Sequence, residues 1–229
     1  MRIGILETGY TPDVLQPRWG RYPEFFARML DGRGFDFRGW AVVDMEFPDS
    51  VQDAEGWLIT GSRHGAYDNL PFIPVLERFV RDAVAARVPV VGICFGHQII
   101  AQALGGRVEK FPGGWQVGPQ EYDFVGQTLT LNAWHQDQVI APPEGAEVIA
   151  THPSCRYAGL RYGDAALSVQ AHPEFDNDFF GSLIEARGRG LVPEPVLQAA
   201  VSRLDRPLDT ARIADTIEAF LRHPRTCAV

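Results

Sequence analysis

One apolar run, which ends in a cysteine between two glycines, constrains the fold of this chain more than any other feature. The run Val88–Ile93 is rich in β-branched residues and bounded by turn signals, as in a strand buried on both faces. From Phe95 onward, apolar residues recur at helical spacing, and Gly105 closes the segment as a C-cap. Cys94 is therefore predicted to lie at a sharp turn between a strand and a helix.

The residues around Cys94 suit it to a chemical role. Gly92 and Gly96 let the chain bend tightly and pack without Cβ clashes, as in the nucleophile elbow of serine hydrolases. A helix N-terminus favours the thiolate, which is the nucleophilic form of cysteine. The alternative is a buried structural cysteine, because free cysteines are among the most buried residues. The Gly-x-Cys-x-Gly frame and a motif far downstream favour the nucleophile.

The downstream motif, His172-Pro173-Glu174, can supply a base and a group that orients it. In an extended segment, residues two apart project to the same side, and Pro173 holds the backbone near extended values. Glu174 can then bind one nitrogen of His172 while the other nitrogen faces a thiol. Alone, His-Pro-Glu is more typical of a surface turn. Together with a cysteine elbow in this chain order, it indicates a Cys-His-Glu catalytic triad.

The two motifs, Gly92–Gln98 and Gln170–Glu174, together resemble the signature of class I (triad-type) glutamine amidotransferases. The similarity runs from the first predicted strand to the end of the second motif. The resemblance implies the roles of nucleophile, base and orienter for Cys94, His172 and Glu174, in that order. It also implies that Gln98 helps to hold the substrate side chain.

The order of the predicted elements is typical of an α/β protein. Predicted strands at 2–6, 35–43, 56–60 and 88–93 alternate with helices at 23–30, at 74–86 and after Cys94. This order predicts a mostly parallel twisted sheet with helices on both faces, and the resemblance implies the flavodoxin-like class I amidotransferase fold. Shorter strands are predicted between 108 and 169, for example at 128–132 and 147–150. Three helices at about 176–222, the last capped by Asp209 or Thr210, would complete a single domain over 1–229.

Acyl transfer also needs two N–H donors where the tetrahedral oxyanion forms. The N–H of Phe95 is one candidate, and the loop that follows the third predicted strand offers Gly61 or Ser62 as the other. The resemblance supports a backbone contribution from this loop, and the alternative is a simple strand-end turn. His64 in the same loop is either a substrate contact or without a role. His97, on the elbow helix, is expected to be structural.

A third segment, at 133–139, resembles the loop that lies near the glutamine in this family. Trp134 would form a wall of the pocket, and groups around His135 would bind the α-carboxylate. The alternative is a polar turn between two strands.

Composition excludes several function classes. The net charge of -8 disfavours non-specific binding to nucleic acid or acidic membranes. No apolar stretch approaches the roughly 20 residues that cross a bilayer, and we expect no signal peptide before the first strand. The three cysteines, Cys94, Cys155 and Cys227, are too few and too scattered for a disulfide framework or a zinc site. We therefore expect a cytoplasmic protein with no metal or other cofactor, and the resemblance implies a small-molecule substrate.

Three functions stay open. The chain could hydrolyse the side-chain amide of glutamine through a cysteine thioester and pass ammonia to a separate synthase, since no synthase domain is visible after Glu174. It could instead act alone on γ-glutamyl peptides or conjugates, or serve as a non-catalytic cysteine sensor or binding module. The intact triad argues against the sensor. Family frequency favours glutamine, whereas the lack of a fused acceptor domain favours the stand-alone hydrolase.

Overall fold

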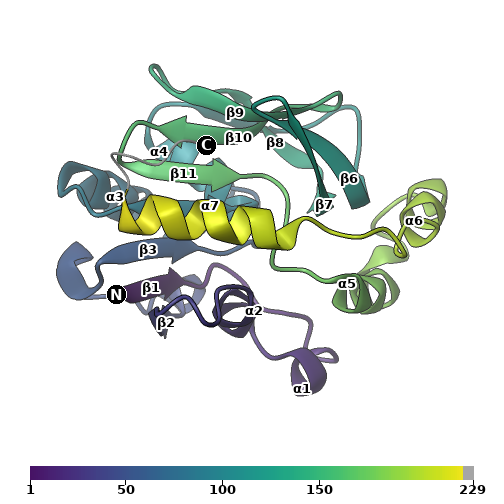
Figure 1. Ribbon diagram of the computed structural model, residues 1–229, viewed down its shortest axis with the longest axis horizontal. Coiled ribbons are helices and arrows are strands. Elements are labelled where there is room, and N and C mark those ends of the chain that lie inside the picture. The colour runs from purple at the N-terminus through teal and green to yellow at the C-terminus, as the bar shows by residue number, and fades with distance from the viewer. Residues whose placement is uncertain (224–229) are drawn as a thin grey trace.

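The computed structural model describes residues 1–223 and contains one large sheet and one small sheet (Figure 1). In chain order, the strands of the large sheet are β1 (Arg2–Leu6), β2 (Asp36–Trp40), β3 (Gly56–Ile59), β4 (Val90–Ile93), β6 (Gln116–Phe124), β7 (Gln127–His135), β9 (Glu147–His152), β10 (Cys155–Tyr162) and β11 (Ala166–Val169). The small sheet pairs β5 (Arg107–Lys110) with β8 (Asp137–Ala141). Cys227, the third of the cysteines considered above, lies outside the described residues.

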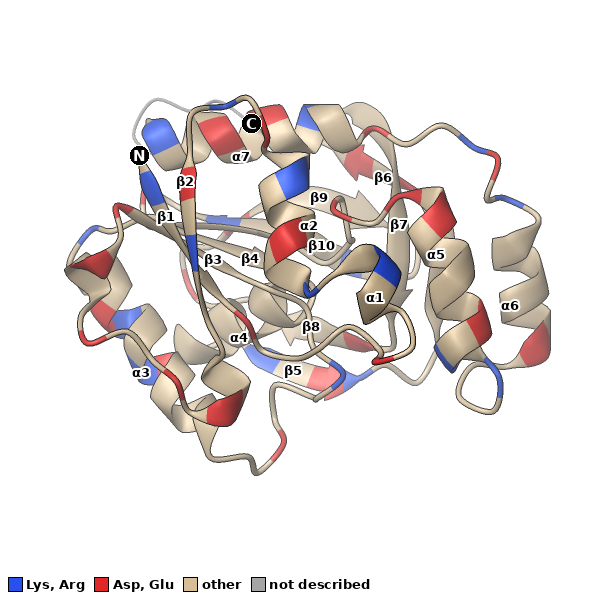
Figure 2. Cartoon of the chain, turned by 90° about the horizontal axis from the view of Figure 1, so that it is seen from below, with Lys and Arg blue, Asp and Glu red and all other residues tan. Residues whose placement is uncertain are grey.

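The helices are α1 (Gln16–Trp19), α2 (Tyr22–Met29), α3 (Phe72–Ala85), α4 (Phe95–Ala103), α5 (Asn177–Leu183), α6 (Glu194–Val201) and α7 (Thr210–Arg222). Two short 3-10 turns, η1 (Val42–Asp44) and η2 (Val51–Asp53), and one π-helical turn, η3 (Ile184–Gly188), complete the elements. Acidic and basic residues both occur on several helices, among them α2, α3 and α7 (Figure 2). Among residues 1–223, none of the helices has the length and apolar character needed to cross a bilayer.

The large sheet has a parallel half and an antiparallel half. Strands β2, β1, β3, β4 and β11 lie side by side in that order and run parallel. Strands β10, β9, β6 and β7 continue the sheet with antiparallel pairing. The parallel half confirms the predicted α/β class, and the antiparallel half is built from the shorter strands expected after position 108.

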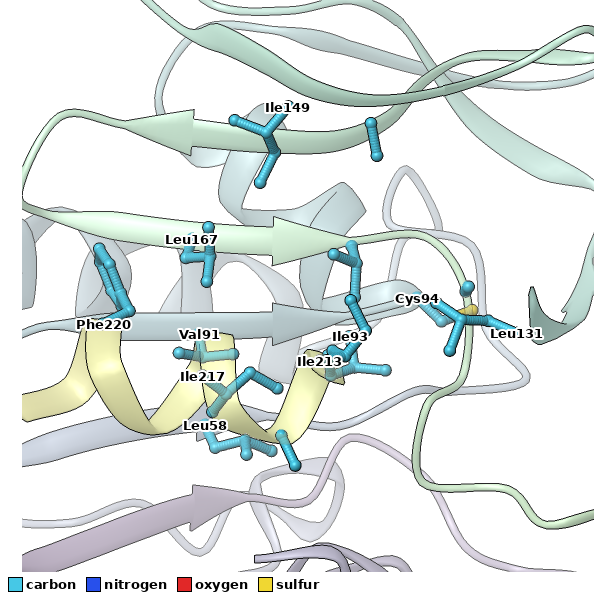
Figure 3. Packing of buried hydrophobic residues seen from close by; sticks show 14 of the residues in the cluster. Leu58, Val91, Ile93, Cys94, Leu131, Ile149, Leu167, Ile213, Ile217 and Phe220 are labelled. Atoms are coloured by element: carbon cyan, nitrogen blue, oxygen red, sulfur yellow. The ribbon is translucent and has the colours of Figure 1, made fainter. Parts of the chain in front are cut away.

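Helices cover both faces of the parallel strands, as predicted. On one face, α2 and α7 pack against alternate residues of the strands, whereas α3 and α4 pack on the opposite face. Figure 3 shows Ile213, Ile217 and Phe220 of α7 directed at Val91 and Leu167. These three residues follow the i, i+4, i+7 spacing of one helix face. Burying an aliphatic or aromatic side chain of this size stabilises the fold by about 1.5–3 kcal/mol, so the central strands are held from both sides.

Two segments differ from their predicted form. The strand predicted at 35–43 ends at Trp40, because residues 42–44 turn into η1, where the N–H of Met45 bonds to the carbonyl of Val42. The segment at 133–139, expected to be a loop, consists of the end of β7, Gln136 and the start of β8. Pairing extends both strands: β7 pairs with β6, which precedes it in a hairpin, and β8 pairs with β5, from which β6 and β7 separate it in the chain.

The three predicted C-terminal helices are confirmed, with an added turn where α5 runs on into η3. Of the three, only α7 covers the parallel strands, whereas α5 and α6 lie to one side of the sheet (Figure 1). There α6 packs tightly on β6, since a Cβ at Gly118 would lie 2.8 Å from that of Ala200. Asp209 occupies the N-cap position of α7, as predicted, and its carbonyl accepts from the N–H of Ile213. Its carboxylate does not cap the helix, because it accepts a hydrogen bond from the N–H of Thr130 on β7 (2.8 Å).

Candidate active site

Cys94 lies at the turn between β4 and α4, as the sequence predicts. Its backbone has φ 54° and ψ −102°, a conformation that is strained for any residue with a side chain. The N–H of Cys94 donates to the carbonyl of Val169 on β11 (2.9 Å), and its carbonyl accepts from the N–H of Gln98 (3.1 Å). These bonds fix the turn at both ends and hold the sulfur beyond the end of β4 (Figure 3).

The two flanking glycines allow the close approach that the turn requires. A Cβ on Gly92 would lie 2.4 Å from the carbonyl oxygen of Gly96, and a Cβ on Gly96 would lie 2.4 Å from that of Ile59. No larger side chain fits at either position without moving backbone. The strand, the helix and the neighbouring strand β3 therefore pack directly on one another around Cys94.

His172 and Glu174 meet beside Cys94. The Nδ1 atom of His172 lies 2.7 Å from Oε1 of Glu174, and both side chains are buried. The thiol of Cys94 is a hydrogen-bonding partner of the same imidazole. The backbone N–H of His172 donates to the carbonyl of Asn132 on β7 (2.8 Å), which anchors the segment that follows β11. The arrangement is a line from thiol to imidazole to carboxylate.

The charge on His172 is set by its two neighbours. Burial alone would lower the pKa of this imidazole, but the Glu174 carboxylate and the Cys94 sulfur outweigh burial and raise its pKa above the ordinary 6.5. The positive imidazolium is therefore favoured in this position. A positive imidazole beside a sulfur stabilises negative charge there, and the thiolate is the form of cysteine that attacks carbonyl carbon.

The loop after β3 is held rigidly by hydroxyl groups. The carbonyl of Gly61 accepts hydrogen bonds from the hydroxyls of Thr8 and Thr60 (3.0 Å each), and the Ser62 hydroxyl donates to the carbonyl of Thr8 (2.7 Å). Within residues 1–223, no acceptor takes a hydrogen bond from the N–H groups of Gly61, Ser62 or Phe95. The three backbone donors predicted for an oxyanion are thus unoccupied.

Gly61 also packs directly on the line of three residues. A Cβ at this position would lie 2.8 Å from Cε1 of His172 and 3.7 Å from Cβ of Cys94. The loop after β3 therefore contacts the imidazole and the elbow at the same point. A glycine is needed here because the space for a methyl group is already filled by the imidazole ring.

A cavity of about 250 Å³ opens at the sulfur. Among its lining residues are five that the sequence singled out, namely Ser62, Cys94, Gln98, Trp134 and His135. Trp134 forms an aromatic wall with Trp115 and Phe180, whose rings lie 6.1 and 5.7 Å from its own. Burial lowers the pKa of His135 to about 3, so this imidazole is neutral. His64 also lines the cavity, whereas His97 is fully buried with Nδ1 2.8 Å from the Ser168 hydroxyl, consistent with a structural role.

Gln98 supports the cavity wall. Its Nε2 donates to the carbonyl of Asp137 (2.9 Å) and to Oε1 of Gln170 (3.1 Å). Both amide protons are therefore used within the protein, and Gln98 fixes the start of β8 against the elbow helix. This bonding gives Gln98 a positioning role at the cavity in addition to lining it.

Asp137 is the pocket residue that the sequence reasoning missed. It is the one carboxylate among the cavity-lining residues of the described chain. Burial raises its pKa above the ordinary value, and the hydroxyl of Tyr67 only partly offsets this effect. Lys110 is close enough to lower the pKa of Asp137 as well. Asp137 stands two residues after His135, in a segment already assigned to the pocket, so its acidic character was the available signal. Arg187 also lines the cavity, but it comes from η3, and nothing near it in the sequence indicated this.

The fold and the elbow site together define a class of amide-cleaving α/β enzymes. A family model described as "Glutamine amidotransferase class-I" matches residues 45–187. This chain belongs to the class-I glutamine amidotransferase family and is an amidohydrolase of that class.

Two relatives and one solved structure illustrate the similarity. A glutamine amidotransferase-like protein of Schizosaccharomyces pombe is 31% identical, over 96% of this chain and 98% of the relative. Gamma-glutamyl peptidase 2 of Arabidopsis thaliana is 28% identical, over 94% of each chain. The crystal structure of a glutamine amidotransferase from Methylobacillus flagellatus has a TM-score of 0.77 at 22% identity, over 100% of this chain and 96% of that one, and shows that the fold is shared.

Proposed function

We propose that this chain, acting alone, hydrolyses γ-glutamyl amides, with Cys94 as nucleophile, His172 as acid and base, and Glu174 as its orienter. The observation that supports acting alone is the loop after β3. Hydroxyls of Thr8 and Thr60 hold the carbonyl of Gly61 within this chain itself, and its N–H faces no competing acceptor among residues 1–223. An ammonia donor that waits for a partner is expected to have this loop displaced. Here the loop already contacts the imidazole.

Acylation begins with attack of the Cys94 thiolate on the γ-carbonyl carbon. A carbon–sulfur bond forms, and the carbonyl π electrons move to oxygen, where the N–H groups of Phe95 and of Gly61 or Ser62 stabilise the negative charge. As the tetrahedral species collapses, the carbon–nitrogen bond breaks and the His172 imidazolium gives its proton to the departing amine. The products of this half-reaction are a free amine and a γ-glutamyl thioester on Cys94.

Deacylation uses the same groups in reverse. Neutral His172 takes a proton from water, and the hydroxide equivalent attacks the thioester carbon. The carbon–sulfur bond breaks, the γ-carboxylic acid is released and gives its proton to solvent, and the thiolate and imidazolium are restored. Glu174 holds Nδ1 throughout, so that the other ring nitrogen stays directed at the reacting atoms.

The α-amino acid end of the substrate would occupy the cavity of about 250 Å³. Its ammonium group would meet the carboxylate of Asp137, and its carboxylate would meet Lys110 and backbone groups near His135. Trp134 would cover the methylene chain. A ligand with one charge of each sign matches a cavity that is lined by a carboxylate and by cationic side chains.

The similarity to gamma-glutamyl peptidase 2 over 94% of both chains also supports the proposed hydrolysis of γ-glutamyl amides. A similarity also exists to a component of the glutamine-hydrolysing GMP synthase of Methanocaldococcus jannaschii, 30% identical over 62% of this chain. If this chain were instead an ammonia donor, a separate acceptor protein would be required for full activity. The scattered cysteines are consistent with a reducing compartment, and we propose the cytoplasm.

A substrate panel tests this function. The purified chain is given glutamine, a γ-glutamyl dipeptide and γ-glutamyl anilide, and release of glutamate and amine is measured, with Cys94→Ala as the control. We expect turnover on the order of 1 per second for a γ-glutamyl compound without any added protein, and none with Cys94→Ala. Weak turnover that rises many-fold with an added synthase would overturn the stand-alone function. Full activity in Cys94→Ala would overturn the catalytic assignment.

A further inference from the structure

A second cavity, of about 450 Å³, adjoins the one at Cys94. It is formed by the loop after β1, by part of the loop after β3 and by η3. Arg63, His64 and Arg187 line both cavities, so these three side chains form a shared boundary. Hydrolysis of glutamine, which releases only ammonia, would not use this second cavity.

The order of the strands explains why the two cavities lie together. Strands β1, β3 and β4 are parallel neighbours, so their carboxyl ends reach the same edge of the sheet. Adjacent strands are about 4.8 Å apart. The loop after β1 therefore lies two strands from the sulfur of Cys94, with the loop after β3 between them. A group bound over the end of β1 is within reach of a substrate whose scissile bond is at the end of β4.

The boundary carries positive charge that the protein does not neutralise. Among the described residues, neither Arg63 nor Arg187 has an ion-pair or hydrogen-bond partner. Asp13, the one carboxylate that lines the second cavity among residues 1–223, accepts a hydrogen bond from the neutral amide of Gln16 (3.3 Å) and forms no ion pair with either arginine. Burial and the charge of Arg63 lower the pKa of His64, so that this imidazole adds no charge.

The remaining wall is polar and held in place. The Tyr10 hydroxyl donates to the carboxylate of Asp44, and the Arg21 guanidinium lies 4.6 Å from the centre of the Tyr10 ring. Arg21 is fixed in turn by an ion pair with Glu7, which is buried at the end of β1. Thr11, also in this wall, has a buried hydroxyl without a hydrogen-bond partner in residues 1–223. A buried, unpartnered hydroxyl beside unpaired cations is an arrangement that a polar anionic ligand would complete.

We propose that the second cavity binds the leaving amine of the substrate, and that Arg63 and Arg187 select an amine that carries a carboxylate. The preferred substrate is then a γ-glutamyl peptide, whose leaving group is an amino acid or a short peptide. This inference rests on the proposed function and narrows its substrate class. Glutamine releases only ammonia and has no atoms that reach the second cavity. A neutral γ-glutamyl amide could occupy the second cavity, but it has no carboxylate for the guanidinium groups to bind.

Two matched substrates test the inference. γ-Glutamylglycine and γ-glutamylglycinamide share the scissile bond and differ at the far end, where the first has a carboxylate and the second a neutral amide. We expect the kcat/KM of the native chain to favour γ-glutamylglycine by about tenfold or more. In Arg63→Gln and Arg187→Gln, that ratio should fall toward one, with the larger share of the loss on γ-glutamylglycine.

Arg189→Gln is the matched control. It removes the same charge from an exposed arginine two positions after Arg187, and Arg189 lines neither cavity at the active site. Its ratio should equal that of the native chain. Thermal unfolding of all three variants separates altered selection from failed folding.

Each outcome bears on one claim. Equal kcat/KM for the two substrates in the native chain, or an unchanged ratio in Arg63→Gln and Arg187→Gln, overturns the leaving-group site while leaving γ-glutamyl hydrolysis intact. A ratio that also falls in Arg189→Gln shows a general charge effect and overturns the assignment of these two residues. No cleavage of either substrate or of glutamine overturns the proposed function itself.

Discussion

The ring of Phe175 lies parallel to the imidazole of His172, with 4.2 Å between the ring centres and 5° between the planes. Glu174 holds one edge of the imidazole, and Phe175 covers one face of it. The carbonyl of Phe175 in turn accepts a hydrogen bond from Nδ2 of Asn132 (3.0 Å). The orientation of the imidazole is therefore fixed by neighbouring residues of its own segment and by β7.

Replacing Phe175 by leucine should separate orientation from stability. We expect a loss of about 1 kcal/mol in unfolding free energy and a fall of about tenfold in kcat/KM, because the imidazole gains freedom to rotate. Phe179→Leu is the control, since Phe179 is fully buried and contacts Phe175 but does not stack on His172. It should lose similar stability without the kinetic loss. Equal kinetic losses in the two variants would contradict the orienting role.

Glu174→Gln should reduce both activity and the stability that His172 contributes. Without the carboxylate the pKa of His172 falls, the imidazolium is less populated, and kcat/KM should drop about a hundredfold. Because the folded-state pKa of His172 is raised, its contribution to stability is complete below 6.5 and is lost as pH rises through the folded value. On going from pH 6.5 to alkaline pH, the native chain should thus lose more unfolding free energy than Glu174→Gln. Identical losses in denaturant titrations would contradict the charged pair.

Gly61→Ala should damage catalysis more than folding. The added methyl group would lie 2.8 Å from Cε1 of His172, so either the ring or the loop must move. We expect kcat to fall about a hundredfold, as for loss of an oxyanion donor, with a small change in melting temperature. Gly39→Ala, where the nearest atom would be 3.6 Å away, is the control and should keep native activity. Native kcat in Gly61→Ala would exclude this loop from the reaction.

Asp137→Asn should weaken recognition of the substrate ammonium. We expect KM to rise about tenfold with kcat nearly unchanged, since the contact is made equally in the ground and transition states. Acetylating the α-amino group of the substrate should raise KM in the native chain but add nothing further in Asp137→Asn. Asp49→Asn, at an exposed carboxylate that does not line the cavity, should resemble the native chain. Additive effects of acetylation and Asp137→Asn would show that the ammonium binds elsewhere.

A γ-glutamyl electrophile should label Cys94 and spare Cys155. Cys155 is 1% exposed, and burial, with a smaller effect of the Cys94 sulfur, raises its pKa to about 12, so its thiolate is scarce. Peptide mass spectrometry after limited labelling measures both sites. Labelling should be abolished by excess substrate. Faster modification of Cys155 than of Cys94 would contradict the assignment of the nucleophile.

The elbow and the His172-Glu174 pair were predictable because short-range geometry specifies them. Gly92 and Gly96 mark a turn that only small residues permit, and the alternation of an extended segment places Glu174 beside His172. Most of the parallel strands were equally visible, since β1, β3, β4 and β11 are short, largely buried runs, whereas β2 at the edge of the sheet is mostly exposed. These features depend on neighbours in the sequence, and the sequence shows them directly.

Features that depend on distant partners were less visible. Residues 133–139 look like a loop until β6 and β5 extend them into strands. The carboxylate of Asp209, expected to cap α7, binds instead the N–H of Thr130, some eighty positions earlier. No local pattern indicates that bond. Arg187 lines the cavity because η3 continues α5 toward the active site. A polar residue in a short helical turn gives no sequence signal of such a position.

The positive φ of Cys94 makes the fold less stable than it would be with glycine at the same position. Glycine adopts this conformation without the clash of a Cβ, which for other residues costs about 1–2 kcal/mol. A Cys94→Gly chain should therefore be inactive yet melt at a higher temperature than Cys94→Ala. The proposed role of Cys94 as nucleophile accounts for a side chain where the fold alone would favour none, so designed variants freed from catalysis should prefer glycine at this position.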